Sequence, residues 1–227
     1  VDPFEVRFLQ KRALAFPVLA LAQASKEIGY MASVVHTMVS KGKELIEDYS
    51  PQLKASLKKM DDEVDYLHEH IIGYLTSLSE SELSAEDSRR SYELLMITTD
   101  LEHIGDIVSK SIVVFARKIS DSTPPLPSRE QKELFAFYEE AMHLFSQTME
   151  AFEKNNRAAA HEIFQRRTSL YARFESYCKR HFERLYRHHD SSLHQTAIHV
   201  DLMEEINRIN IFTFRISAHL LGIAKAE

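Results

Sequence analysis

Residues 51–79, PQLKASLKKMDDEVDYLHEHIIGYLTSLS, decide the fold. Apolar side chains recur in this stretch at alternating steps of three and four residues, at Leu53, Leu57, Met60, Val64, Leu67, Ile71, Tyr74 and Leu78. Such a heptad-like stripe is typical of a helix that packs lengthwise in a bundle. Ser50 and Pro51 stand where a helix favours a capping serine and a proline in its first turn. We therefore predict one long helix here, about 40–50 Å in length at 1.5 Å per residue.

The same pattern continues on both sides of this stretch. Similar stripes run over residues 18–49 and 94–119, and three more run over residues 134–152, 163–185 and 202–223. The two sets of three are separated by the segment Ser120 to Pro127, which holds three of the 6 prolines. Three helices, a linker and three further helices indicate an internal duplication. We predict an all-α fold of two tandem three-helix bundles with spectrin-like packing: residues 1–120 with an N-terminal lead-in, a linker at 121–127, and residues 128–227.

Composition limits the classes of function. The chain has 227 residues, of which 44% are hydrophobic and 27% charged, as in an ordinary globular protein. A formal charge of −6 argues against a general nucleic-acid partner, which usually requires a basic surface. The single cysteine, Cys178, excludes an intramolecular disulfide and a cysteine-based zinc site. No run approaches the roughly 18 apolar residues of a membrane span.

Four carboxylates lie beside the predicted core stripes of the first half. Asp61 and Asp65 each follow a core position of the second helix, and Glu102 and Asp106 do the same in the third. A spacing of four places both members of a pair on one helical face, where like charges cost roughly 0.2–0.5 kcal/mol. A bound cation would reverse that cost, and Mg, Mn, Fe or Zn accepts carboxylate oxygens. The alternative is that these acids are solvated and point away from one another.

The third helix carries a recognisable motif. Leu101-Glu-His-Ile-Gly-Asp106 places a glycine in mid-helix, where it costs about 1 kcal/mol relative to alanine and is typical of a close approach by another backbone or a ligand. The hexapeptide resembles the LERIGD signature of PhoU domains, with His103 in place of the arginine. Asp61-Asp-Glu-Val-Asp65 is similar to the acidic motif on the second helix of that family. The resemblance implies two tandem three-helix bundles whose E/DxxxD motifs hold metal, here with Asp61, Asp65, Glu102 and Asp106 as ligands.

Further stretches resemble one branch of the family. Residues 17–24, 26–31, 74–83 and 97–101 are similar to the PhoU-like C-terminal cytosolic domain of bacterial sodium/phosphate cotransporters. This resemblance implies a cytoplasmic domain of an inner-membrane protein whose membrane part precedes Val1. The implied partner is the membrane domain of a phosphate transporter, on the same or a separate chain, or another regulatory protein, and a homo-oligomer stays open.

The second half departs from the acidic pattern. Superposing the repeats at an offset of about 105 residues sets Asn207 against Glu102 and Ile211 against Asp106. Arg167 and Tyr171 stand where Asp61 and Asp65 stand in the first half. Arginine and isoleucine cannot replace carboxylate ligands, so the second half is expected to lack the metal site.

The remaining candidates are weaker. His188, His189, His194 and His199 have an HHxxxxH spacing that suits Zn or Ni, although a polar turn flanked by helix ends is the preferred interpretation. Cys178 follows a core tyrosine and is interpreted as a buried thiol rather than a nucleophile. The sequence has no glycine-rich phosphate loop and no GxSxG elbow. We therefore expect no enzymatic activity.

The sequence thus favours a non-enzymatic regulatory domain associated with phosphate transport, as part of a sodium/phosphate cotransporter. One alternative is a free-standing PhoU-type regulator that acts with a separate transporter. A second alternative, from another class, is a carboxylate-bridged metal enzyme or metal-storage bundle. Ferritin-like sites of that class take ligands from four helices, including ExxH motifs, whereas only two helices supply carboxylates here.

Overall fold

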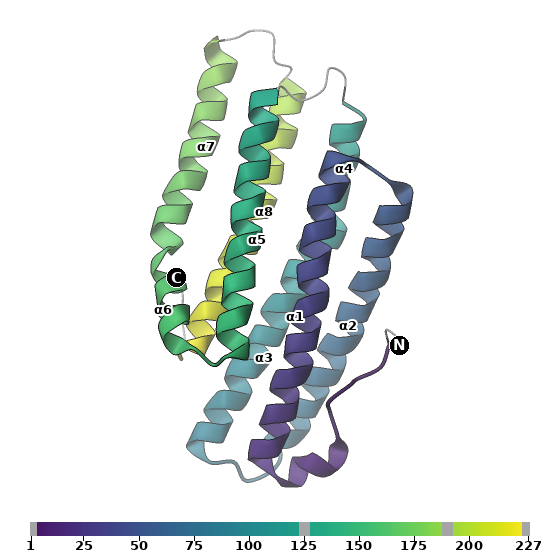
Figure 1. Cartoon of the computed structure of the whole chain (residues 1–227), viewed down its shortest axis with the longest axis vertical. Coiled ribbons are helices and arrows are strands. Elements are labelled where there is room, and N and C mark those ends of the chain that lie inside the picture. Colours follow the sequence, from purple (N-terminus) through teal and green to yellow (C-terminus); the bar gives the residue numbers. More distant parts are fainter. Residues whose placement is uncertain (1–3, 123–127, 188–192, 224–227) are drawn as a thin grey trace.

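The computed structural model describes residues 4–122, 128–187 and 193–223, and it contains no strand within these ranges. Long α-helices account for most of the described residues (Figure 1). In chain order the elements are η1 (Lys11–Ala15), α1 (Pro17–Glu47), α2 (Pro51–Ser79), α3 (Ala85–Asp106), the π-helical η2 (Ile107–Ile112), α4 (Val113–Ser120), α5 (Ser128–Glu153), α6 (Arg157–Gln165), α7 (Arg167–Arg187) and α8 (Leu193–Leu220).

The helices begin where capping residues stand in the sequence. Ser50 caps α2 by accepting a hydrogen bond from the Leu53 amide at 3.3 Å. Ser84 caps α3 by accepting from the Asp87 amide at 3.1 Å, and its hydroxyl donates to the Asp87 carboxylate at 2.7 Å. Asn156 caps α6 by accepting from the amide of Ala159 at 3.0 Å. These side chains satisfy amide groups that the first turn of a helix leaves without a partner.

The six predicted helices are present, with two differences in detail. The fifth is divided at Arg166 into α6 and α7, and the third passes from α3 through the wider η2 turn into α4. Val18, assigned to the first core stripe, is 74% exposed because it lies in the first turn of α1, before the helix packs on its neighbours. Residues 123–127 of the predicted linker at 121–127 lie outside the described residues, as do residues 188–192 of the predicted turn.

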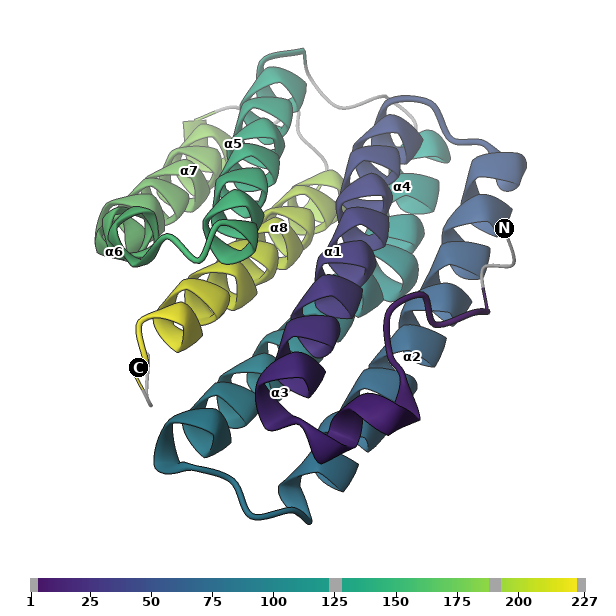
Figure 2. The same ribbon diagram turned by 60° about the horizontal axis from the view of Figure 1, so that its bottom comes forward.

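The helices form two three-helix sets that lie side by side. The first set contains α1, α2 and the α3–η2–α4 rod, and the second contains α5, the α6–α7 pair and α8 (Figure 1). Figure 2 shows α8 running alongside α3 and α5 lying next to α1. The predicted all-α architecture of two three-helix bundles is therefore confirmed. Buried side chains of both sets belong to one continuous hydrophobic cluster.

Polar contacts also join the two sets. Tyr138 of α5 is fully buried, and its hydroxyl donates to the Val39 carbonyl of α1 at 2.8 Å. Gly42 faces the same hydroxyl so closely that a Cβ added there would lie 2.6 Å from it. Asp100 of α3 is 0% exposed and faces Arg215 at 3.0 Å and His219 at 3.2 Å, both on α8. Side chains with no exposed surface thus make polar contacts across the interface between the sets.

Candidate metal centre

Three of the four predicted carboxylates meet between α2 and the end of α3. Asp61, Asp65 and Asp106 each offer an oxygen, and these oxygens all lie within 4.8 Å of one another. Asp61 is buried, Asp106 is half-buried and Asp65 is exposed, so the group opens to the surface on one side. The spacing of four on α2 placed Asp61 and Asp65 on one face, as the sequence indicated.

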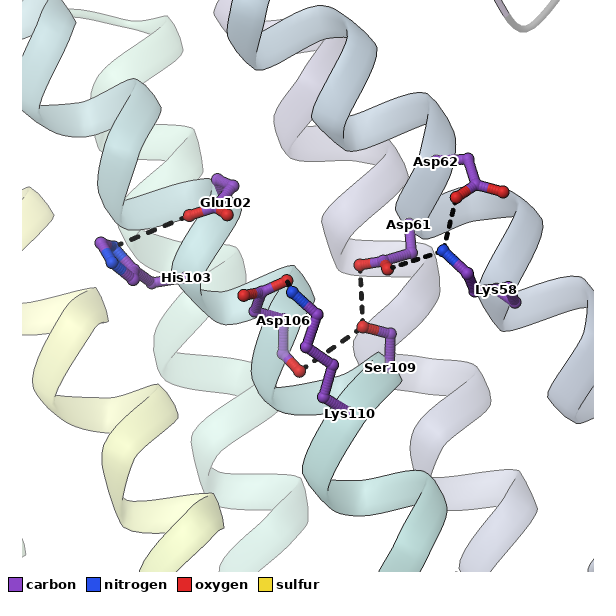
Figure 3. Close-up of polar contacts among 8 residues, drawn as sticks. All are labelled: Lys58, Asp61, Asp62, Glu102, His103, Asp106, Ser109 and Lys110. Carbon is purple, nitrogen blue, oxygen red and sulfur yellow. Dashed lines mark hydrogen bonds and ion pairs between the residues drawn. The ribbon is translucent and has the colours of Figure 1, made fainter.

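The η2 turn directly follows Asp106 and supplies two contacts to the carboxylates. Ser109 donates from Oγ to Asp61 Oδ1 at 2.7 Å, and Lys110 Nζ lies 2.5 Å from Asp106 Oδ1 (Figure 3). A π-helical turn is rare and occurs frequently at functional sites, because the extra residue changes the direction of the side chains that follow. Here that change brings the Ser109 hydroxyl next to Asp61 and the Lys110 ammonium group next to Asp106.

Lysines partly neutralise the carboxylates. Lys58, one turn before Asp61, lies 3.6 Å from Asp61 Oδ2 and 2.5 Å from Asp62 Oδ1 (Figure 3). The hydrogen bond to Asp106 raises the pKa of Lys110, which keeps its ammonium group charged. Both lysines are mostly exposed, so they can move aside for a cation at a modest cost in free energy.

Electrostatic repulsion remains within the group. Burial, followed by the charges of Asp61 and Asp106, raises the pKa of Asp65. The carboxyl group of Glu102 has its pKa raised by burial first and by Asp106 next. Both shifts have the direction expected for like charges brought together out of water. A divalent cation among these oxygens would stabilise the ionised forms, and an oxygen-only ligand set suits Mg²⁺, Mn²⁺ or Fe²⁺, with Zn²⁺ also accepted.

Glu102 lies beside the three aspartates rather than among them. Its carboxylate is outside the group whose oxygens come within 4.8 Å, and it lies 4.0 Å from His103 Nδ1. His103 itself is directed toward the second bundle, where its ring stacks on Phe212 with the centroids 4.8 Å apart. The structure therefore assembles Asp61, Asp65 and Asp106 and leaves Glu102 one helical turn away.

Gly105 does not have the tight environment that its place in the motif predicts. A Cβ at this position would lie 3.5 Å from Val64 Cγ1 and 3.7 Å from Met38 Cε, which are ordinary van der Waals distances. An alanine would thus fit between α1 and α2 without displacing either helix. The glycine that permits a close approach is Gly42, at the interface between the bundles.

The corresponding flank of the second bundle has a different character. Arg167, Tyr171, Asn207 and Ile211, which replace the four acids, line a cavity of about 390 Å³ between α7 and α8, and the cavity also contacts Arg215. Arg167 stacks over the Phe164 ring at 4.1 Å from its centroid. No carboxylate is among the residues that line this cavity.

The histidines predicted to surround one turn are distributed otherwise. His188, His189 and the side chain of His194 lie outside the described part of the chain. His199 is buried in α8, against the interpretation that it belongs to a polar turn, because the α8 face that carries it packs toward α5 and α7. Cys178, which was interpreted as a buried thiol, is half-buried, and burial raises the pKa of its thiol.

Asp100 is a residue of the acidic segment whose role the sequence did not reveal. It precedes the hexapeptide motif by one residue, yet its side chain points to the second bundle, where it contacts Arg215 and His219. Its helical phase could have identified this role, because Asp100 lies about 200° around the helix from Glu102 and therefore faces away from the side of α3 that carries Glu102.

An all-helical chain with two three-helix sets and E/DxxxD carboxylates on the second and third helices has the architecture of PhoU proteins. Residues 28–111 match the family model of the PhoU domain, a range that extends from within α1 into η2 and includes all four predicted ligands. This match agrees with the resemblance of the motif Leu101 to Asp106 to the signature of PhoU domains.

Solved structures and curated relatives extend this similarity over most of the chain. PhoU from Pseudomonas aeruginosa superposes with a TM-score of 0.80 at 15% identity, covering 90% of this chain and 96% of that protein. The phosphate transport system regulatory protein PhoU from Streptococcus pneumoniae gives a TM-score of 0.79 at 14% identity, covering 93% and 98%. At such identities the likeness establishes the fold alone.

The relatives that match by sequence are longer proteins. The chain is 26% identical over 204 residues to proteins of Salmonella typhimurium and Escherichia coli that carry the name "Putative inorganic phosphate export protein YjbB". The match covers 90% of this chain, which spans 37% of the length of those relatives. None of the helices in the described ranges is long and apolar enough to cross a membrane.

Proposed function

We propose that this chain is a non-enzymatic PhoU-like module that regulates phosphate transport through contacts with a transporter. The observation that carries the proposal is the PhoU-domain match in the first bundle, joined to a fold that overlays nearly the whole length of two PhoU proteins. The names of the YjbB relatives, which refer to phosphate export, support the same process. Two long bundles that present surfaces and grooves suit protein interaction better than catalysis.

A direct test is phosphate flux in cells of the source organism that lack the gene. Loss of the protein is expected to change the rate of phosphate uptake or export, and the native chain should restore it. Unchanged flux across low and high external phosphate would overturn the regulatory assignment.

The first bundle is proposed to hold a divalent cation at Asp61, Asp65 and Asp106. The three oxygens fit the hard cations named above, because they converge from two helices and already repel one another. Glu102 is close enough for Asp106 and Asp65 to raise the pKa of its carboxyl group, after burial as the first cause. Bound metal would fix α2 relative to α3 and set the shape of the surface that a partner contacts.

Elemental analysis of purified, tag-free protein tests the metal proposal. The native chain is expected to carry a stoichiometric amount of Mg, Mn, Fe or Zn that is lost in Asp65→Ala/Asp106→Ala. The matched control is Asp62→Ala/Glu69→Ala, which removes the same charge from exposed positions on α2. A Glu102→Ala variant then asks whether that carboxylate also binds. A native protein that stays metal-free after equilibration with these ions, or a double variant that keeps its metal, would contradict the assignment.

Two arrangements of the module in the cell follow from different observations. The overlay on nearly complete PhoU proteins supports a free-standing regulator that meets a separate transporter. The similarity to the YjbB proteins, of whose length the chain spans 37%, supports a domain of a longer phosphate-export protein. The proposal that this longer protein is a membrane transporter of the sodium/phosphate type rests on the resemblance of residues 17–24, 26–31, 74–83 and 97–101. An immunoblot of fractionated source cells distinguishes them: a band near 26.3 kDa outside the membrane fraction indicates the first, and a much larger membrane-bound band the second.

A further inference from the structure

A second group of metal-ligating side chains lies in the second bundle, away from the acidic site. Glu130 comes from the first turn of α5, His181 from α7 and His199 from α8. Each residue offers one ligand atom, and these atoms all lie within 4.8 Å of one another. The start of α5, the end of α7 and the start of α8 lie at the same end of this bundle (Figure 1).

All three of these side chains are buried, whereas in the first bundle only Asp61 is buried, Asp106 is half-buried and Asp65 is exposed. His181 is 2% exposed, His199 is 3% exposed and Glu130 is 9% exposed. The two imidazole rings stack with their centroids 4.4 Å apart and their planes 13° from parallel. His181 Nδ1 also lies 3.6 Å from Glu130 Oε1. Burying a carboxylate and two imidazoles together is costly unless each gains strong polar interactions.

Two imidazoles and one carboxylate form a ligand set that borderline transition metals prefer. Zinc takes histidine nitrogens and carboxylate oxygens at about 2.0–2.2 Å, which places neighbouring ligand atoms about 3.3 Å apart in a tetrahedron. To bind one ion, the stacked rings would have to turn so that one nitrogen of each points to it, and ligand atoms that now lie within 4.8 Å of one another would approach to about 3.3 Å. Mg²⁺ favours oxygen ligands and octahedral geometry, so it suits the aspartates of the first bundle better than this group.

We propose that Glu130, His181 and His199 bind one Zn²⁺ or a similar borderline transition-metal ion. The fourth position is left for water or a further ligand. The ion would tie α7 to α5 across the end of the bundle, whereas α7 otherwise packs chiefly on α8. The site is therefore structural: it locks the second bundle, and its metal preference differs from that of the acidic site. It does not depend on the proposed role in phosphate transport.

The test uses the full chain without a histidine tag, stripped with a chelator and titrated with Co²⁺ and Zn²⁺. We expect one equivalent of Co²⁺ to give the visible absorption of a four- or five-coordinate site, and Zn²⁺ to displace it while millimolar Mg²⁺ does not. Zn²⁺ at about 100 times its Kd should raise Tm by about 5–10 °C. Absence of the Co²⁺ bands together with an unchanged Tm would overturn the proposal.

Conservative variants show which residues bind Zn²⁺. His199→Gln and Glu130→Gln are each expected to weaken Zn²⁺ binding at least about 100-fold, since loss of a ligand exceeds the 10–100-fold effect of losing an outer partner. The matched control His143→Gln changes an exposed histidine of α5 and should bind like the native chain. Asp65→Ala/Asp106→Ala should also keep this site, which separates it from the first-bundle proposal. Equal Zn²⁺ affinity of a folded His199→Gln variant and the native chain would refute the assignment.

Discussion

Between α2 and α3 the first half gathers aspartates, whereas between α7 and α8 the second half places Arg167, Tyr171, Asn207 and Ile211 at the matching positions. Both halves are sets of three helical rods, so such a set does not itself require acids at these positions. Carboxylates at four-residue spacing repel one another, and the second half shows that the bundle forms without them. The fold therefore does not account for the acids of the first half, which is consistent with the cation site proposed for them, and the second flank serves as an internal reference.

The largest change in the free energy of unfolding is expected on removal of Arg215, a residue of the second flank that contacts the first bundle. Arg215 lines the cavity of the second flank and faces Asp100, which has no exposed surface. Arg215→Ala should lower the free energy of unfolding by about 3–5 kcal/mol, because it leaves a buried carboxylate with only His219 beside it. Urea denaturation measures this change.

Arg208→Ala is the matched control for that variant on the same helix. Arg208 is half exposed and pairs with Glu205 at 2.8 Å, so its removal should cost less than about 1 kcal/mol. Equal effects of the two variants would mean that Arg215 of the second flank does not stabilise the contact between the halves.

A smaller effect is expected at the glycines of the first half. Gly42→Ala should destabilise the protein by about 1–3 kcal/mol, because the new methyl group collides with the Tyr138 hydroxyl that joins the two halves. Gly73→Ala on the outer face of α2 meets nothing within 4 Å and should stabilise by up to about 1 kcal/mol through helix propensity. Thermal unfolding of both variants checks the opposite signs, and two changes of the same sign would contradict this description of the interface.

The smallest effect concerns the lysine that accompanies the acidic flank. Lys110→Ala removes a cation that competes for Asp106, so divalent-metal affinity should rise by up to about 5-fold, the equivalent of a surface ion pair of about 1 kcal/mol. Titration calorimetry measures the change. Lys154→Ala removes a similar exposed pair with Glu150 in the second half and should leave metal affinity unaltered. Weaker binding by Lys110→Ala would indicate that the lysine supports the site instead.

Local signals made most of the fold predictable from the sequence. Ser50 with Pro51, and Ser84 with Asp87, mark helix starts through short-range hydrogen bonds, so they can be read without knowledge of the tertiary structure. The break at Arg166 was not predicted, because neither glycine nor proline marks it. Its position depends on packing of α6 and α7 against α8, which the local sequence does not encode.

In the candidate sites too, residues could be predicted from the sequence only where a local motif or spacing connects them. Asp61 and Asp65 could be paired from their spacing on one helix, and the motif on α3 located Asp106. The contribution of Ser109 depends on the η2 turn, which changes the phase of the helix without any sequence signal that we recognised. Glu130, His181 and His199 lie on three separate helices, so no local spacing connects them, and only the tertiary structure brings them together.

The continuous core has a consequence for any attempt to separate the duplicated halves. Because α1 packs on α5 and α3 on α8, a fragment ending at Ser122 would expose the apolar faces that the second half covers, and a fragment starting at Ser128 would do the same. The halves are therefore complementary fragments rather than autonomous modules. Expressed together from two genes, they should reassemble as a split protein, whereas each alone should aggregate. Neither half could then be lost or replaced alone.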